Sequence, residues 1–262
     1  MKKHNILFLL LFLIAPSAFG IDYTTYLLYP DGASDTNCYT KQDEQDRDGW
    51  WYNVAEPLIK VALPTGTPKA NILLIPGGGY GGIAYWNEGD RAAEWFLSQG
   101  YAVAVLKYRM PCGNPDIPFE DACQAMTMLR QNAKAYGLNK KGQFGAVGFS
   151  AGGHLAGLLA TKAQKDAKPD WCVLGYPVVS FEEDITHMGS RDNFLGKNPT
   201  AEKIKEWSLD QNISTKTSAM FIALAQDDDI VKITNSTRLY RALLPMGIYS
   251  ELFIMPTGGH GF

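Results

Sequence analysis

The chain has 262 residues, of which 46% are hydrophobic and 19% are charged, and its formal net charge at pH 7 is −3. This length suits one large domain with a sizeable core, and the acidic balance argues against nucleic acid as a partner. Apart from an apolar run at the N-terminus, no segment is long and apolar enough to cross a membrane.

The first 20 residues have the pattern of a secretory signal peptide. Lys2 and Lys3 form a basic start, residues 6–15 form an apolar run, and small residues occupy positions 18 and 20. The run is short for a bilayer span, so we expect cleavage after Gly20, with an uncleaved anchor as the alternative. The mature protein would be one domain, residues 21–262, secreted or periplasmic and not bound to a membrane.

The first half of this domain begins with a polar and aromatic stretch, residues 21–54, which we interpret as an irregular leader. Its Trp50-Trp51-Tyr52 run could stack on a sugar ring or pack on the domain. Apolar runs then predict an edge strand and two buried strands, and glycines end two predicted helices. The strands are expected at 58–63, 71–75 and 102–106, and the helices at 88–98 and 119–136.

A glycine-rich loop, residues 76–82, follows the strand at 71–75. It lacks the Lys-Ser/Thr pair of a P-loop and the helix-opening glycine pattern of a Rossmann fold. In Gly-x-Ser-x-Gly hydrolases the oxyanion hole combines the amide after the serine with amides of such a loop. We therefore expect the amides of Gly78, Gly79 and Ala151 to be the donors; the alternative is a plain flexible turn.

Residues 148–152, Gly-Phe-Ser-Ala-Gly, carry the signature of a nucleophile elbow, in which a serine occupies a tight turn between a strand and a helix. An apolar strand is predicted just before it, at 143–147, and a helix just after it, at 151–162. Glycines two positions before and after the serine leave the space that the turn needs. The pattern predicts Ser150 as a nucleophile; the alternative is a glycine-rich turn with a surface serine.

The second half continues the alternation of strands and helices. Residues 177–217 form a long polar insertion with weak helical signals. Around it we expect strands at 171–176, 219–224 and 250–255 and a helix at 234–244. Strands separated by helices predict an α/β fold with a mostly parallel sheet covered on both faces.

A serine nucleophile needs a base, usually histidine, and the chain has four histidines. His4 would leave with the signal peptide. His154 follows Ser150 by one helical turn and is expected to be a partly buried histidine with its hydrogen bonds satisfied. His187 lies in the insertion and can line a pocket. His260 stands among glycines after the last strand, where a loop can bring it over Ser150, so it is our predicted base.

The residue that orients the base should lie between the serine and the histidine, on the loop after the penultimate strand. Asp227, Asp228 and Asp229 stand there. Only one of them can point at His260, and a solvated acidic turn is the alternative interpretation of the run.

Four cysteines, Cys38, Cys112, Cys123 and Cys172, would face an oxidising compartment, and their three possible pairings stay open. Cys112 and Cys123 are closest along the chain, and Cys172 lies in an apolar strand, as a buried thiol would. Their spacing does not match a zinc site, and we expect neither a metal nor an organic cofactor.

Several motifs resemble those of secreted bacterial α/β-hydrolase esterases of the acetyl xylan esterase and feruloyl esterase type, related to the hormone-sensitive-lipase-like group. The motifs are PGGGY at 76–80, NEG at 87–89, KYRMP at 107–111, GFSAGGHL at 148–155, YPV at 176–178, THMGS at 186–190 and GGHGF at 258–262. The resemblance covers residues 51–262. It implies an α/β-hydrolase fold and selects Asp228, because the family's aspartate lies three residues before a valine, here Val231.

Two features depart from the family. Asn87 replaces a histidine that often precedes Glu-Gly, and the chain ends two residues after His260, where this fold normally continues into a helix. The sequence is accordingly expected to be a C-terminally truncated domain or to have a mobile histidine loop.

The resemblance implies a serine ester hydrolase that removes acetyl or other small acyl groups from a polysaccharide such as xylan. Tyr80 and His187 are the expected substrate contacts, and a small-molecule or oligosaccharide ester is the expected partner; the oligomeric state is left open. The alternatives are a general short-chain carboxylesterase, an oligopeptidase-like acyl hydrolase, and an inactive hydrolase-fold protein that binds carbohydrate.

Overall fold

The computed structural model describes residues 20–33 and 35–262, so residues 1–19 of the expected signal peptide lie outside the described residues. The described chain contains one sheet of eight strands in the order β1-β4-β6-β5-β7-β8-β9-β10. The strands are β1 (Thr24–Leu27), β4 (Leu58–Ala62), β5 (Asn71–Ile75), β6 (Ala102–Lys107), β7 (Phe144–Phe149), β8 (Trp171–Gly175), β9 (Ala219–Ala225) and β10 (Ser250–Met255). Within this sheet β4 runs in the opposite direction to the other seven strands, so its pairings with β1 and β6 are antiparallel and the rest are parallel. A separate hairpin joins β2 (Gln45–Arg47) to β3 (Trp50–Tyr52).

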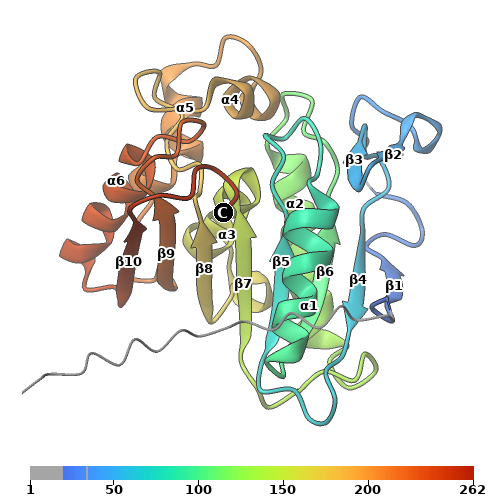
Figure 1. Cartoon of the computed structure of the whole chain (residues 1–262). Coiled ribbons are helices and arrows are strands. Elements are labelled where there is room, and N and C mark those ends of the chain that lie inside the picture. Colours follow the sequence, from blue (N-terminus) through green and yellow to red (C-terminus); the bar gives the residue numbers. More distant parts are fainter. Residues whose placement is uncertain (1–19, 34) are drawn as a thin grey trace, which may run out of the picture.

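Helices cover both faces of the sheet, in front of it and behind it in Figure 1. They are α1 (Arg91–Ser98), α2 (Asp116–Gln131), α3 (Ser150–Thr161), α4 (Met188–Leu195), α5 (Ala201–Trp207) and α6 (Thr234–Leu243). A π-helix spans Tyr85–Asp90, and short 3₁₀ turns span Lys41–Asp43, Lys165–Ala167, Leu209–Gln211 and Leu244–Met246. The central strands β5 and β6 are buried along their whole length, as strands covered on both faces must be. The predicted α/β-hydrolase fold with a mostly parallel sheet is confirmed.

None of the helices within residues 20–33 and 35–262 combines the length and the apolar character that a bilayer span requires.

The N-terminal part of the domain differs from the prediction. Residues 21–54 are not wholly irregular, because β1 pairs with β4 from Thr24 opposite Val61 to Leu27 opposite Leu58. The strand β4 is therefore an inner strand, and the edge belongs to β1. A four-residue edge strand with exposed side chains has no apolar run for sequence analysis to detect.

Three helix boundaries also differ, one of them the end of α2, which stops at Gln131 rather than at residue 136. The predicted helix at 88–98 is a π-helix up to Asp90 followed by α1, and α2 begins at Asp116, three residues earlier than predicted. Pro118 is compatible with this early start, because a proline in the first turn of a helix loses no intrahelical hydrogen bond.

The insertion at 177–217 has a polar composition, but most of its apolar side chains are buried against the rest of the domain. Its apolar side chains join the main core, among them Val178, Phe181, Phe194 and Trp207. They are too widely spaced along the chain to form a periodic pattern, which explains the weak helical signals. Figure 1 shows that α4 and α5 lie over the end of the sheet at which the C-terminus lies.

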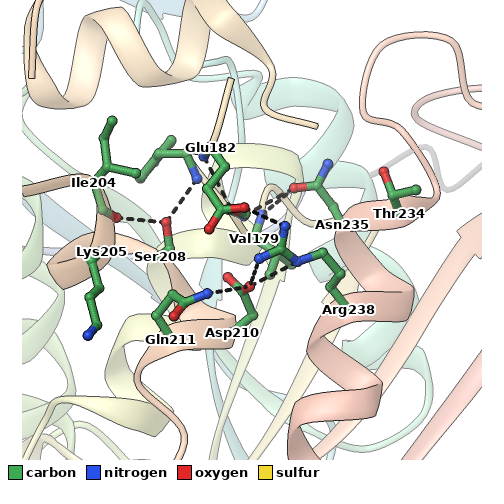
Figure 2. A network of polar contacts seen from close by, with 12 residues as sticks. Val179, Glu182, Ile204, Lys205, Ser208, Asp210, Gln211, Thr234, Asn235 and Arg238 are labelled. Carbon is green, nitrogen blue, oxygen red and sulfur yellow. Dashed lines mark hydrogen bonds and ion pairs between the residues drawn. The ribbon is translucent and has the colours of Figure 1, made fainter. Parts of the chain in front are cut away.

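Polar contacts fasten this insertion to α6, as Figure 2 shows. The buried Asn235 accepts hydrogen bonds from the amides of Val179 and Ser180 through its Oδ1 atom, at 3.0 and 3.2 Å. The Arg238 guanidinium contacts the carboxylates of Glu182 and Asp210 at 2.6 and 2.7 Å. The insertion is thereby held in one position relative to the sheet.

Cys38 and Cys112 form a disulfide, and Cys123 and Cys172 are free thiols. The Cys172 side chain is buried, as expected. The bond joins the leader to the loop after β6, across 74 residues of sequence. Disulfides stabilise mainly by restricting the unfolded chain, typically by about 2–4 kcal/mol.

Candidate active site

Ser150 is the first residue of α3 and directly follows β7, so it stands on the strand-to-helix turn that the motif predicts. Its φ angle is 53°, in the left-handed region that costs energy for any residue with a β-carbon. Only glycine fits at positions 148 and 152, because any side chain there would clash with neighbouring backbone. A β-carbon on Gly148 would lie 2.2 Å from the Gly152 carbonyl oxygen, and one on Gly152 would lie 2.1 Å from the Ile75 oxygen.

Three polar side chains form a hydrogen-bonded series at this turn. The His260 Nε2 atom lies 2.9 Å from Ser150 Oγ, and His260 Nδ1 lies 2.8 Å from Asp228 Oδ2. An ionised carboxylate can only accept, so Nδ1 carries the proton and Nε2 of the neutral ring accepts from the serine hydroxyl. The series therefore has the direction that a serine nucleophile requires.

The three neighbouring aspartates have separate positions. Asp228 is buried, and its second oxygen accepts from the amides of Ile230 and Val231 at 2.9 Å each. Asp227 accepts from the Gly259 amide at 2.8 Å, which lowers the pKa of that carboxyl and ties down the loop that carries His260. Asp229 is exposed. The contact between Asp227 and Gly259 was not anticipated from the sequence.

The glycine-rich loop lies against the elbow. Gly78 and Gly79 line the cavity in front of Ser150, both with positive φ angles, 128° and 61°. Ala151 is the second residue of α3, where a backbone N–H has no intrahelical partner. A β-carbon on Gly77 would lie 2.8 Å from Ser150 Cβ, so the loop approaches the serine as closely as backbone can.

Glu88 is a half-buried carboxylate beside the serine that sequence analysis did not assign. It accepts from the Gly77 amide at 2.5 Å and from the Tyr176 hydroxyl at 3.1 Å. Burial raises the pKa of Glu88, and these two hydrogen bonds oppose the rise. The Tyr176 ring in turn packs edge-on against His260, with centroids 4.8 Å apart. Glu88 thus connects the glycine loop to the histidine; its only sequence signal was its place in the NEG motif.

Tyr80 does not contact the cavity, which corrects the expectation that it binds substrate. Its side chain is 1% exposed, and its hydroxyl lies 2.7 Å from His154 Nδ1. His154 is completely buried rather than partly buried, and its Nε2 lies 2.7 Å from the Trp207 carbonyl oxygen. Apolar neighbours from the insertion enclose both rings, so their place could not be inferred from residue spacing.

His187 lines the cavity and caps the first turn of α4. Its Nδ1 atom accepts from the Ser190 amide at 3.3 Å and lies 2.8 Å from Ser190 Oγ. Since an amide can only donate, the neutral ring carries its proton on Nε2. Burial, followed by repulsion from His260, lowers the pKa of His187. The ring lies beside the glycine loop, since a β-carbon on Gly79 would be 3.6 Å from it. His187 can therefore offer its Nε2–H as an uncharged donor next to this loop.

The cavity in front of Ser150 has a volume of about 830 Å³, within the usual range of small-molecule sites. Its wall is formed by Trp50, Gly78, Gly79, Ala84, Asn87, Glu88, Arg91, Ala92, Phe149, Ser150, Tyr176, His187, Ile230, His260, Gly261 and Phe262. Of the aromatic run in the leader, Trp50 lines the cavity, and Trp51 instead contacts Lys107. Among the described side chains there is no cluster of three His, Cys, Asp or Glu residues suited to a metal ion.

His154 makes the stability of the domain dependent on pH. Burial lowers its pKa from the ordinary 6.5 to about 4, so below pH 6.5 the unfolded chain binds a proton that the folded chain does not. We expect the free energy of unfolding to fall by about 2 kcal/mol between pH 7 and pH 5 from this group. Urea unfolding of wild type and His154→Gln at pH 5 and 7 measures it. An equal loss of stability in both proteins would contradict this origin.

Comparison with known proteins identifies relatives. The BD-FAE family model matches residues 60–243, more than half of the chain. An acetylxylan esterase of Xylanibacter ruminicola is 36% identical over 208 residues, covering 76% of this chain and 42% of the relative. Endo-1,4-beta-xylanase B of Butyrivibrio fibrisolvens is 33% identical over 205 residues, covering 72% of this chain and 32% of the relative. The chain thus spans less than half the length of these curated relatives.

Among solved structures, the acetyl ester-xyloside bifunctional hydrolase of Caldicellulosiruptor lactoaceticus superposes with a TM-score of 0.77 and 29% identity, covering 93% of this chain and 89% of that one. The resemblance seen in the motifs is therefore confirmed, and this chain belongs to the BD-FAE family of α/β hydrolases.

Proposed function

We propose that the protein is a serine carboxylic ester hydrolase that removes acetyl groups, or other small acyl groups, from xylan-type oligosaccharides. One observation carries the proposal: the hydrogen-bonded series from Ser150 through His260 to Asp228, in which the serine and the histidine line the cavity. A nucleophile, a base and an orienting acid in this order are what acyl transfer requires.

In the proposed reaction, Ser150 Oγ attacks the ester carbonyl carbon while its proton passes to His260 Nε2. The carbonyl oxygen becomes an oxyanion, which the amides of Gly78, Gly79 and Ala151 would stabilise. Collapse of this intermediate breaks the bond to the alcohol oxygen, which takes the proton from His260, and leaves an acyl-Ser150 ester. A water molecule then attacks this ester while its proton passes to His260. The bond between the acyl carbon and Ser150 Oγ breaks, Oγ takes the proton back from His260, and the carboxylic acid is released. Asp228 keeps the imidazole oriented throughout.

Three relatives support the xylan-type substrate, since their names refer to acetylxylan, to xylan chains or to acetyl esters and xylosides. The cavity supports it as well. Its wall mixes apolar side chains with His187, Asn87 and Arg91, which can hydrogen-bond sugar hydroxyls. The sequence has no evident long hydrophobic lid segment, which leaves little apolar surface for a long acyl chain and favours small acyl groups.

We also propose that the protein is exported, being secreted or periplasmic after removal of residues 1–20. The disulfide between Cys38 and Cys112 supports this location, because such bonds persist in oxidising compartments. Acetylated polysaccharide would be available to the enzyme there.

Purified protein should release acetate from acetylated xylo-oligosaccharides. It should also prefer p-nitrophenyl acetate over p-nitrophenyl octanoate by more than about tenfold in kcat/KM, or roughly 1.4 kcal/mol in the transition state. The measurement is a panel of both chromogenic esters, acetylated xylan and feruloylated sugars.

A preference for octanoate without release of acetate from xylan would reject the carbohydrate substrate and leave a general carboxylesterase. A complete lack of hydrolysis of every ester in the panel would favour the inactive, carbohydrate-binding alternative.

A further inference from the structure

A second cavity adjoins the one in front of Ser150. It has a volume of about 490 Å³ and is lined by Ile21, Tyr23, Lys60, Trp86, Asp90, Arg91 and Glu94, together with Gly20, which would leave with the signal peptide. Arg91 lines both cavities, so the second one begins where the wall of the first one ends. A ligand that extends from Ser150 past Arg91 would enter it.

Trp86 presents a large exposed aromatic surface in this second cavity. Its side chain is 53% exposed, although exposing an indole to water is unfavourable. The residue is nevertheless held in place, because its amide donates to the Gly49 carbonyl oxygen at 2.9 Å. A β-carbon on Gly49 would lie 2.4 Å from Trp86 Cβ, so the indole is supported directly by the backbone of the β2–β3 hairpin. Trp86 is thus a fixed surface rather than a loose side chain.

The Arg91 guanidinium lies 5.3 Å from the centre of the Trp86 ring and steadies it from one side. Within residues 20–33 and 35–262, no carboxylate lies within ion-pair distance of Arg91. Its donors are therefore free to reach a ligand at the junction of the two cavities.

The side-chain charges around the second cavity are of both signs, and removal of residues 1–20 would add the positive amino group of Ile21. Lys60 and Arg91 supply two cations, and Asp90 and Glu94 supply two carboxylates. One Asp90 oxygen accepts from the Tyr23 hydroxyl at 2.9 Å, and the Lys60 ammonium lies over the Tyr85 ring. A charged ligand would meet attraction and repulsion together. A neutral ligand rich in hydroxyls suits the site better, because a hydroxyl can donate to a carboxylate and accept from a guanidinium.

We propose that this second cavity is a binding site for neutral pyranose units of the oligosaccharide whose ester lies at Ser150. The apolar face of a sugar ring would stack on Trp86, and its hydroxyls would bond to Arg91 and Glu94. The proposal rests on the proposed function for the identity of the ligand. It adds that recognition extends beyond the ester to sugar units further along the chain.

The test measures binding without catalysis. Ser150→Ala protein is titrated calorimetrically with unacetylated xylo-oligosaccharides of two to six units. Affinity should rise with chain length, and adding Trp86→Ala should weaken binding of the longest oligosaccharide by at least about tenfold, a usual size for loss of an aromatic ligand contact. Arg91→Gln, a change at an exposed position, should weaken it by about threefold or more, as loss of a hydrogen bond to a ligand does.

Trp95→Ala is the matched control. Trp95 is 54% exposed, lies on α1, packs on Phe96 and lines neither cavity. Its loss should leave affinity within about twofold, because it removes the same exposed indole area without touching the proposed site. Thermal unfolding of each variant verifies that it is folded.

Equal affinities for Trp86→Ala and Trp95→Ala would overturn the proposal, and so would failure of the Ser150→Ala protein to bind any oligosaccharide. Failure of the proposed function has a different signature. Wild-type protein would then not hydrolyse p-nitrophenyl acetate, while the difference in sugar affinity between the two tryptophan variants would persist.

Discussion

Replacing Ser150 by alanine should lower kcat on p-nitrophenyl acetate by about 10⁴-fold or more, because the change removes the only atom that can form the acyl-enzyme. The His260 imidazole loses its hydrogen bond from Oγ but keeps its bond to Asp228, so the base stays in position. Residual hydrolysis would come from the oxyanion amides acting on bound ester and water. Initial rates at saturating ester, with active protein quantified independently, measure the effect.

The fold should tolerate this change. Alanine keeps the β-carbon that already occupies the strained backbone at φ 53°, and the removed hydroxyl lies at a cavity wall rather than in the core. We expect the melting temperature to change by no more than a few degrees. Ser98→Ala, at an exposed serine on α1, is the control for purification and background esterase. Near-wild-type rates in the Ser150 variant would refute the mechanism.

The Asp228→Asn variant should lose about 10⁴-fold in kcat, the scale of such a change in a serine triad. The amides of Ile230 and Val231 would hold the new amide oxygen, which turns the amide NH₂ toward His260 Nδ1. Nδ1 must then accept, so the imidazole proton moves to Nε2 and faces Ser150 as a donor. A histidine in that tautomer cannot take the serine proton. The measurement is kcat on p-nitrophenyl acetate.

The two neighbouring aspartates provide matched controls with the same chemical change. Asp227→Asn keeps an oxygen that can accept from the Gly259 amide, so we expect a loss of less than about tenfold. Asp229→Asn alters an exposed carboxyl and should leave kcat within about twofold. If Asp229→Asn proved the most damaging of the three, the orienting carboxylate would be Asp229 and the assignment of Asp228 would be wrong.

The sequence by itself determined the features that depend on residues close together in the chain: the buried strands, the turn at Ser150 and the order of the site residues. Apolar runs predicted β5 and β6 to within one residue, because buried strands in a parallel sheet need continuous apolar side chains. The elbow at Ser150 was recognisable because its glycines are required by space within five consecutive residues. The chain order of Ser150, the aspartate run and His260 follows from the order of strands in the fold, so it too could be read along the sequence.

Tertiary structure alone decided which residues meet across long distances in the sequence. Glu88 resembles an ordinary surface glutamate until the fold brings Gly77 and Tyr176 to its two oxygens. Tyr80 looks like a pocket residue beside Gly79, yet the insertion supplies the aromatic core that encloses it. The partner of Cys112 likewise depends on the path of the leader. Such contacts are set by the packing of whole elements, whose free energy is shared among many side chains and leaves no local signal.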